Sequence, residues 1–263
     1  MADEIDYEII GDDMQIVEIE LDPGEAVQAE AGAMAYMGPG VQMQTSLGNE
    51  GGGGLLGGLK KGLKRAITGE SFFITSFIHK GSGKGHVAFA APYPGKIIPL
   101  DLTKFGGSIL CQKDAFLCAA RGIEIELAFT RKLGAGLFGG EGFILQRLKG
   151  DGLAFVHIGG TVIKKDLASG ETYHIDTGCV AAFTETVSYD ITWSKDFKNA
   201  LFGGEGVVLA TLTGPGTVYL QSLPFSRLAD RIFAAATYSR RDEHTGVAGT
   251  GVLGGLIGGG KSF

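Results

Sequence analysis

Short runs of alternating apolar and polar residues, separated by glycine turns, recur along most of this chain. The run "FILQRLKGDGLAFVHIGG" begins at Phe143, and "VVLATLTGPGTVYLQSL" begins at Val207. In each, a turn containing two glycines, at 149–152 or 213–216, separates two β-rich segments. Alternation with a period of two around such a turn is typical of a β-hairpin. The pattern therefore predicts an all-β fold.

The hexapeptide "LFGGEG" precedes both hairpins and shows that the chain repeats itself. It places Glu141 and Glu205 64 residues apart. A more divergent copy, "ITGESFFITSFIHKGSGKGHVAFAA", lies upstream, with Glu70 in the corresponding position. Three copies predict three similar β units that share one core about a pseudo-threefold axis.

The repeat also sets the predicted boundaries. The three units span about 10–102, 103–167 and 168–225, and the first carries an insertion at 47–65. We predict one helix near 226–238, because Ser226 can cap it and apolar residues follow at helical spacing. Cuts between the units would expose sheet edges, so residues 1–240 are predicted to form a single domain, followed by a glycine-rich tail at 241–263.

Composition and charge narrow the classes of function. The chain has 263 residues, 45 glycines, 44% hydrophobic residues and a net charge of −6. A large core with many tight turns follows. No stripe of Lys and Arg is present, so we predict no nucleic-acid partner. The acidic start "MADEIDYEIIG" resembles neither a secretory signal nor a transit peptide, and no apolar run is long enough to span a membrane, so the predicted location is cytoplasmic.

The repeated glutamates Glu70, Glu141 and Glu205 are one candidate site. If the units are related by a pseudo-threefold, the three carboxylates form a ring that can hold a cation or a basic partner. The alternative is that each carboxylate is solvated or caps backbone amides in its turn. A phosphate-binding loop is disfavoured, because a β-patterned segment follows and glutamate repels phosphate.

The insertion "LGNEGGGGLLGGLKKGLKR" is a second candidate site, because it combines leucines with four basic residues. These residues are Leu55, Leu56, Leu59, Lys60, Lys61, Leu63, Lys64 and Arg65. Such a segment can contact an anionic membrane surface. Glycine weakens any amphipathic helix there, and the net charge opposes the contact. We therefore favour a flexible loop, or a segment that docks on the protein or on a neighbouring subunit.

Residue patterns for catalysis and cofactors are missing. The five histidines form no H-x-H or H-E-x-x-H pair, and the three cysteines form no C-x-x-C pair. We expect Cys111, Cys118 and Cys179 to be reduced core residues. No G-x-S-x-G elbow is present. We predict no metal, no cofactor and no enzymatic activity, although catalytic partners that meet only through the fold would escape this reading.

The tripled unit, the two "LFGGEG" turns with their hairpins, and the Gly/Leu insertion and tail resemble the altered-inheritance-of-mitochondria (mitochondrial biogenesis) family, in its prokaryotic form. The likeness covers about residues 5–240. It implies a fold similar to three fused subunits of the tryptophan RNA-binding attenuation protein, a β-sandwich of the double-stranded β-helix type. Such a likeness of fold does not transfer RNA or tryptophan binding. The family offers no catalytic residues to carry over.

Three hypotheses of function follow. The leading one is a non-enzymatic binding or scaffold protein that acts through oligomeric β surfaces, with an unknown protein partner. We expect a homo-oligomer, because a broad sheet domain presents edges that proteins usually cover by assembly. The second is a peripheral membrane-associated organiser that uses the Gly/Leu segments. The third is a small-ligand enzyme with an unrecognised site.

Overall fold

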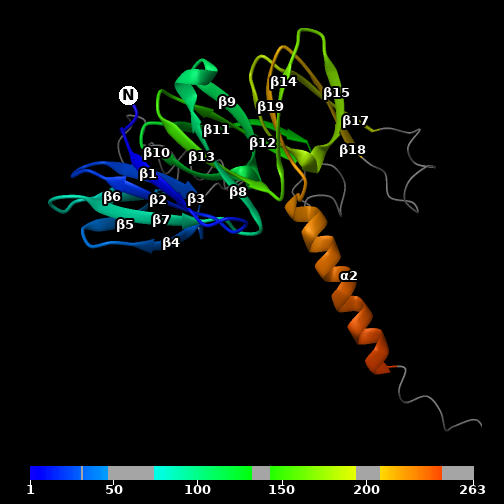
Figure 1. Ribbon diagram of the computed structural model, residues 1–263, viewed down its shortest axis with the longest axis horizontal. Helices are drawn as coiled ribbons and strands as arrows, with labels where there is room; N and C mark the ends of the chain where they lie inside the picture. Colours follow the sequence, from blue (N-terminus) through cyan, green and yellow to red (C-terminus); the bar gives the residue numbers. More distant parts are fainter. Residues whose placement is uncertain (31, 47–73, 132–142, 194–207, 245–263) are drawn as a thin grey trace, which may run out of the picture. The chain divides into compact units, whose positions relative to one another are not determined.

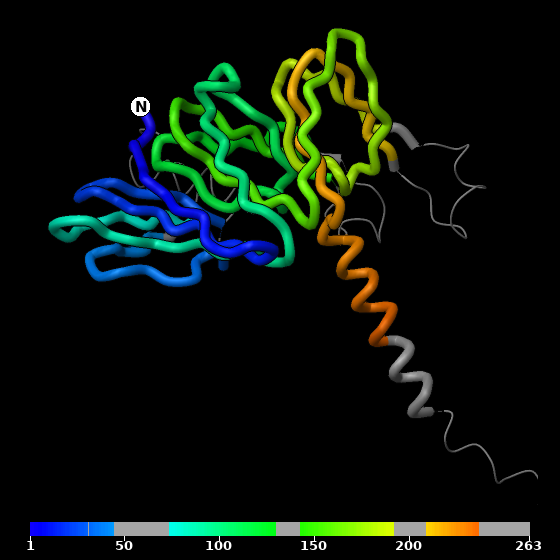
Figure 2. Tube along the Cα trace, viewed as in Figure 1, coloured from blue at the N-terminus to red at the C-terminus, as the bar shows by residue number. Residues whose placement is uncertain are grey.

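The computed structural model describes residues 1–30, 32–46, 74–131, 143–193 and 208–244. The chain divides into two compact parts, Met1–Ser226 and Arg227–Phe263. The first part is built from short β-strands, and Figure 2 traces the chain through them from blue to yellow. This confirms the predicted all-β fold class.

Alternating sequence patterns become strands as predicted. The chain begins with β1 (Asp6–Ile10) and β2 (Ile16–Leu21). The first unit then forms β3 (Ala26–Glu30), β4 (Met34–Met37), β5 (Val41–Ser46), β6 (Ile74–His79), β7 (Gly85–Ala90) and β8 (Gly95–Asp101). The second forms β9 (Ser108–Gln112), β10 (Phe116–Ala120), β11 (Glu124–Arg131), β12 (Phe143–Lys149), β13 (Leu153–Gly159) and β14 (Val162–Leu167). The third forms β15 (Thr172–Asp176), β16 (Val180–Thr184), β17 (Ser188–Trp193), β18 (Val208–Thr213) and β19 (Gly216–Gln221).

The strands form four sheets in the described part of the chain (Figure 1). Two have six strands, in the orders β5-β6-β3-β10-β13-β8 and β11-β12-β9-β16-β19-β14. The other two, β1-β2-β7-β4 and β15-β18-β17, lie at the two ends of the series. Each six-stranded sheet therefore joins four strands from one unit to two strands of the next. We call the pairing of β3 with β10 the first joint and that of β9 with β16 the second joint. The predicted hairpins at 149–152 and 213–216 are wrong, because β12 and β13 lie in different sheets, and so do β18 and β19.

The repeat extends to irregularities in strand pairing. The register shifts by one residue in β4 between Met34 and Tyr36, in β10 between Phe116 and Cys118, and in β16 at the corresponding place. A β-bulge bends the strand and is a specific feature of a fold, not a defect. Its recurrence at the same place in three strands is strong support for three equivalent units. The predicted tandem repeat is confirmed.

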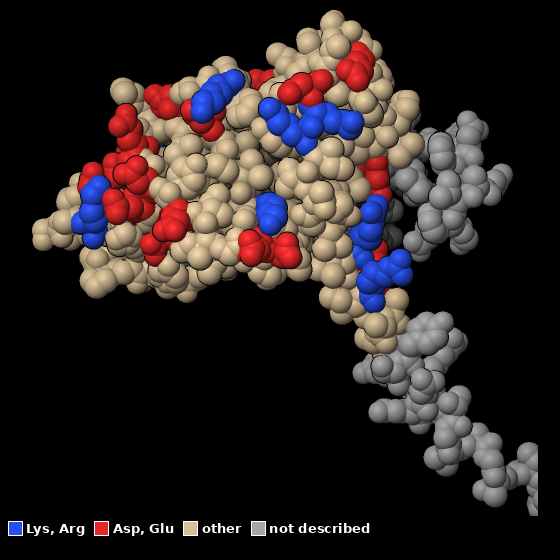
Figure 3. Space-filling view, in the orientation of Figure 1, with Lys and Arg blue, Asp and Glu red and all other residues tan. Residues whose placement is uncertain are grey.

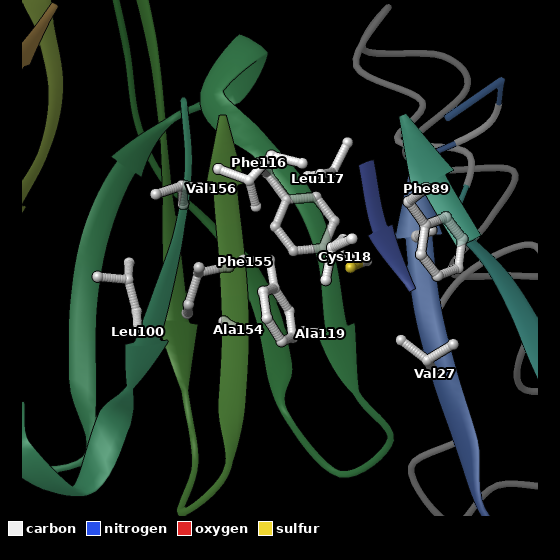
Figure 4. Packing of buried hydrophobic residues seen from close by; sticks show 14 of the residues in the cluster. Val27, Phe89, Leu100, Phe116, Leu117, Cys118, Ala119, Ala154, Phe155 and Val156 are labelled. Atoms are coloured by element: carbon white, nitrogen blue, oxygen red, sulfur yellow. The ribbon is translucent and has the colours of Figure 1, made fainter. Parts of the chain in front are cut away.

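The main hydrophobic cluster runs through the first joint. Figure 4 shows Phe116, Cys118 and Phe155 packed together on neighbouring strands, with Val27 and Phe89 across from them. All five are buried. Burying a side chain of the size of Phe contributes about 1.5–3 kcal/mol. The interior thus joins the units instead of keeping them apart.

Short 3-10 helices link some of the strands, namely η1 (Leu102–Phe105), η2 (Lys113–Ala115) and η4 (Thr177–Cys179). The predicted C-terminal helix is confirmed as α2 (Phe225–His244). It starts directly after Pro224, so Ser226 lies in its first turn and is not its N-cap. Among the described residues, no helix is both long and apolar enough to cross a membrane.

Candidate functional site

Both sites predicted from the sequence lie outside the residues that the structure describes. This holds for the glutamates Glu70, Glu141 and Glu205, and it also holds for the Gly/Leu insertion. The insertion residues concerned are Leu55, Leu56, Leu59, Lys60, Lys61, Leu63, Lys64 and Arg65. The carboxylate ring and the membrane-contacting segment therefore stay predictions.

The strands β4 and β15 lie at the two ends of the series of joints, and within the described part of the chain each has one unpaired side. Among the described residues, β4 pairs only with β7, and β15 pairs only with β18. Their counterparts in the other units are paired on both sides: β10 with β3 and β13, and β9 with β12 and β16. We call β4 and β15 the terminal edges.

The two joints share one register. Cys118 of β10 pairs with Ala29 of β3, and Ala182 of β16 pairs with Cys111 of β9, in both cases in antiparallel orientation. Cys118 and Ala182 are the first residues after the bulge in their strands. The same construction has thus been used twice along the chain.

At the terminal edges the same positions have no partner strand. Tyr36 is the first residue after the bulge in β4, and it therefore corresponds to Cys118 and Ala182. Ile175 of β15 corresponds to the residues that face them, because its register against β18 matches that of β9 against β12. A joint between a β15 and a β4 would therefore place Ile175 opposite Tyr36.

Exposure at these positions is high for apolar side chains. Tyr36 is 45% exposed and Met37 is 43% exposed. Their counterparts at the joints are 0% exposed: Cys118, Ala119, Ala182 and Phe183. On β15, Tyr173 and Ile175 are half-buried and His174 is exposed. Residues that form core at a joint thus form surface at a terminal edge.

The surroundings of the two terminal edges differ in charge. Tyr36 donates a hydrogen bond through its hydroxyl to Glu18 of β2, and this bond raises the pKa of the tyrosine. Glu20 and Asp22 follow, 3.0 and 2.9 Å from Lys84 Nζ. Figure 3 shows acidic side chains gathered over this end of the series. At the other end, Lys165 Nζ lies 4.7 Å from the centre of the Tyr173 ring.

A groove at the first joint is filled by the start of the chain, and we call it the first groove. The backbone amide of Ala2 donates to Asp151 Oδ1 at 2.6 Å, and that of Asp3 donates to the carbonyl of Arg121 at 2.9 Å. The glycines Gly122 and Gly152 make room, because a Cβ atom on either would lie within 2.7 Å of Ala2. The N-terminal segment is therefore part of the packed fold.

Farther along the same segment, side chains complete the fit. The Asp3 carboxylate accepts a hydrogen bond from the Ala26 amide at 2.8 Å and lies 3.0 Å from the Arg121 guanidinium. Ile5 is buried in the main cluster, and the Tyr7 ring meets Phe155 edge-on at 4.9 Å. Residues 1–7 thus occupy the first groove as an extended peptide.

A second groove, of about 940 Å³, lies at the second joint. One side is formed by η1 and the strands beside it, including Lys104 and Ser108, and the other by Lys164, Glu185 and Tyr219. Ser108 Oγ is buried, with no hydrogen-bond partner among the described residues. Glu185 binds the guanidinium of Arg147 from the groove's rim. The lining therefore carries charges of both signs.

Other reactive groups are buried or dispersed. Burial raises the pKa of the Cys111 thiol to about 12 and raises that of Cys118, so neither is a ready nucleophile. Burial lowers the pKa of His157 to about 4, and its ring packs edge-on against Tyr93 at 4.4 Å. Within the described ranges, no three His, Cys, Asp or Glu residues gather closely enough to hold a metal ion.

Sequence reasoning missed both the terminal edges and the grooves. A signal for the edges was present: "MAYM" at 34–37 aligns with core segments such as "FLCA" at 116–119. Methionine and tyrosine side chains that stand side by side on one strand are poorly suited to exposure to solvent. No local signal identifies the groove around Ser108, because its two sides are separated by more than 50 residues.

Comparisons with known proteins agree on the family. The Mitochondrial biogenesis AIM24 family matches residues 7–223. An uncharacterised protein of Streptococcus pyogenes serotype M6 is 33% identical over 216 residues, which are 81% of this chain and 84% of that protein. A crystal structure of a Streptococcus pyogenes protein matches with a TM-score of 0.69 and 27% identity, covering 88% of this chain and 100% of the other.

Proposed function

Because the chain belongs to the Mitochondrial biogenesis AIM24 family, and the relative found in Streptococcus pyogenes serotype M6 is itself uncharacterised, we propose a function from its own geometry. The protein is a non-enzymatic scaffold whose copies assemble head to tail. The β15 edge of one copy pairs with the β4 edge of the next. This contact between two molecules has the same construction as the two joints within each chain.

One observation carries this proposal. Tyr36 and Met37 hold positions that are completely buried at both internal joints, yet they are exposed on β4. The other sheet edges, such as β5, β11 and β17, recur unpaired in every unit. Among the described residues, β4 and β15 lack the joint partner that their counterparts in the other units have. An unpaired strand with apolar side chains is a template for pairing with another chain.

The two terminal edges are different surfaces, so the contact is heterologous. Such a contact closes into a ring when the rotation between copies permits, and otherwise it continues as a filament. Charge supports the pairing of unlike ends, because the Glu18 carboxylate accepts a hydrogen bond from Tyr36 of β4, while Lys165 packs on the Tyr173 ring of β15. Opposite charges of this kind steer association and disfavour pairing of like ends.

Light scattering coupled to gel filtration tests the assembly. Wild-type protein should have a molar mass that is a multiple of 27.4 kDa at micromolar concentration. Met37→Lys should yield the single-chain mass, because the charge would be buried in the new joint. Met43→Lys changes an exposed methionine on β5, outside any joint, and should leave the mass unchanged. A wild-type mass of one chain at all concentrations would end the proposal.

The membrane hypothesis keeps a separate test, since its residues lie outside the described ones. Under the scaffold proposal, the protein does not co-sediment with anionic vesicles. Replacing Lys60, Lys61, Lys64 and Arg65 with glutamine leaves this result and the assembly unchanged. Co-sedimentation that weakens with salt and disappears in that variant would place the membrane hypothesis first. A small-ligand enzyme is the remaining alternative, and nothing in the described geometry favours it.

A further inference from the structure

The two grooves occupy equivalent places in successive units, and only the first is occupied by described residues. Their walls correspond residue by residue, 64 positions apart: Gly122 with Thr186, Gly152 with Gly216 and Phe155 with Tyr219. Strand registers support this, because Phe155 and Tyr219 pair with the residues directly after the bulges of β10 and β16. The first groove holds an extended peptide, which is residues 1–7.

We propose that the second groove binds an extended segment of another polypeptide, with a lysine or arginine and, four residues later, an aromatic side chain. This goes beyond the scaffold function, because the groove lies within one chain and does not depend on assembly. The peptide's required chemistry follows from how the two walls differ.

The basic residue is required where the first groove holds Asp3. In the first groove, Asp3 meets the Arg121 guanidinium and the Ala26 amide. In the second groove, Glu185 takes the place of Arg121, and Ser108 takes the place of Ala26. The charge is therefore reversed. An ammonium group in the place of the Asp3 carboxylate can donate to the Glu185 carboxylate, which lines the second groove.

The aromatic residue is required where the first groove holds Tyr7. Tyr7 packs edge-on against Phe155, and Tyr219 is the matching ring in the second groove. Aromatic pairs in this geometry contribute beyond the area that they bury. Lys104 and Lys164 line the same groove, so the residues between the two anchors should be neutral or acidic. Glu4 and Asp6 are the corresponding residues of the N-terminal segment.

The bound segment is held by side chains of the groove and does not add a strand to the sheet. Next to the first groove, β1 continues the N-terminal segment and pairs with β2. The corresponding edge belongs to β8, where Pro99 has no amide proton to donate and the Ile97 amide already donates to Gln15 Oε1 at 2.7 Å. In the second groove, Thr184 and Thr186 narrow the space that corresponds to the one Ala2 fills in the first groove. A short segment therefore fits best.

The probe is a synthetic peptide of residues 1–7 with the substitution Asp3→Lys, labelled with fluorescein at its C-terminus. Its anisotropy is measured against the full chain. We expect saturable binding, and at least threefold weaker binding of the unsubstituted peptide. Glu185→Gln should weaken binding of the lysine peptide about threefold, because an exposed ion pair of this kind contributes modestly.

Glu126→Gln is the matched control. Glu126 also pairs with Arg147, at 3.7 Å, but it does not line the groove. It should leave peptide affinity unchanged, which separates loss of the groove's carboxylate from a disturbed Arg147. Three results would each overturn the proposal: no saturable binding at millimolar protein, equal affinity for the two peptides, or equal effects of Glu185→Gln and Glu126→Gln. Because each is a property of one chain, failure here leaves the assembly proposal standing.

Discussion

Asp3 and Arg121 form an ion pair across 118 residues of sequence, with 3.0 Å between the carboxylate and the guanidinium. The same carboxylate accepts the Ala26 amide. This pair fastens the first residues of the chain to the joint between the first two units. It also shows which charged groups hold the N-terminal segment in the first groove, whereas the second groove has Glu185 in place of Arg121.

Removing the Asp3 carboxylate should destabilise the fold. We predict that Asp3→Ala lowers the free energy of unfolding by about 1 kcal/mol, because the Ala26 amide loses its acceptor while the half-exposed Arg121 is partly rescued by water. Urea unfolding followed by circular dichroism measures the change. Asp6→Ala removes an exposed carboxylate of β1 and serves as the control, with a change near zero. Equal stability of Asp3→Ala and wild type would show that the N-terminal segment is not part of the packed fold.

The buried His157 should make the free energy of unfolding depend on pH. Its pKa in the folded protein is about 4, below the usual 6.5, because burial disfavours the charged ring. The unfolded chain therefore binds the proton more readily. The stabilising contribution is complete above pH 6.5 and is lost as the pH falls towards 4, by up to about 3 kcal/mol.

The variant His157→Leu isolates this effect, because leucine is apolar and does not titrate. Its stability should change less than that of wild type between pH 7 and pH 4.5 in urea titrations. His86→Gln, which removes an exposed histidine, should keep the wild-type dependence. A wild-type slope in His157→Leu would assign the acid sensitivity to other groups.

Thiol reactivity should distinguish the three cysteines. Cys111 and Cys118 are buried with raised pKa values, whereas Cys179 is partly exposed. Native protein should therefore react quickly with a thiol reagent at one site only, and unfolded protein at three. Cys179→Ser should abolish the fast phase. Fast reaction of more than one thiol in the native protein would contradict the burial of the joint at Cys118.

Local patterns were enough to predict the strands, their repeat and the C-terminal helix. Alternating residues on either side of glycine turns indicate the strands themselves. The predicted hairpins at 149–152 and 213–216 are wrong, because β12 and β13 pair in different sheets, and so do β18 and β19. From the sequence, the glycines that precede the first strand of each unit align as Gly24, Gly107 and Gly170. The strand registers place Gly106 there instead, and two adjacent glycines with positive φ, 73° and 85°, explain the ambiguity.

Long-range pairing could not be predicted in the same way. Nothing local in "FLCAA" indicates that β10 pairs with β3 of the preceding unit, since alternation specifies a face and not a partner. The terminal edges can be identified only when the strand pairing at both joints is known. The grooves depend on residues such as Ser108 and Glu185, which the fold brings to one cavity. The candidate glutamates and the Gly/Leu insertion lie outside the described residues, so their roles stay predictions.

Disulfide formation between two variants, each with one introduced cysteine, tests the head-to-tail joint most directly. Residues opposite each other in antiparallel strands have Cα atoms about 4.5–5.5 Å apart, within the range of a disulfide. Tyr36→Cys and Ile175→Cys, each in a Cys179→Ser background, are mixed and oxidised mildly, then analysed on a non-reducing gel. Head-to-tail assembly predicts a covalent dimer in the mixture and none in either variant alone. Dimer in neither the mixture nor the separate variants, or equal dimer in a variant alone, would contradict the joint between β15 and β4.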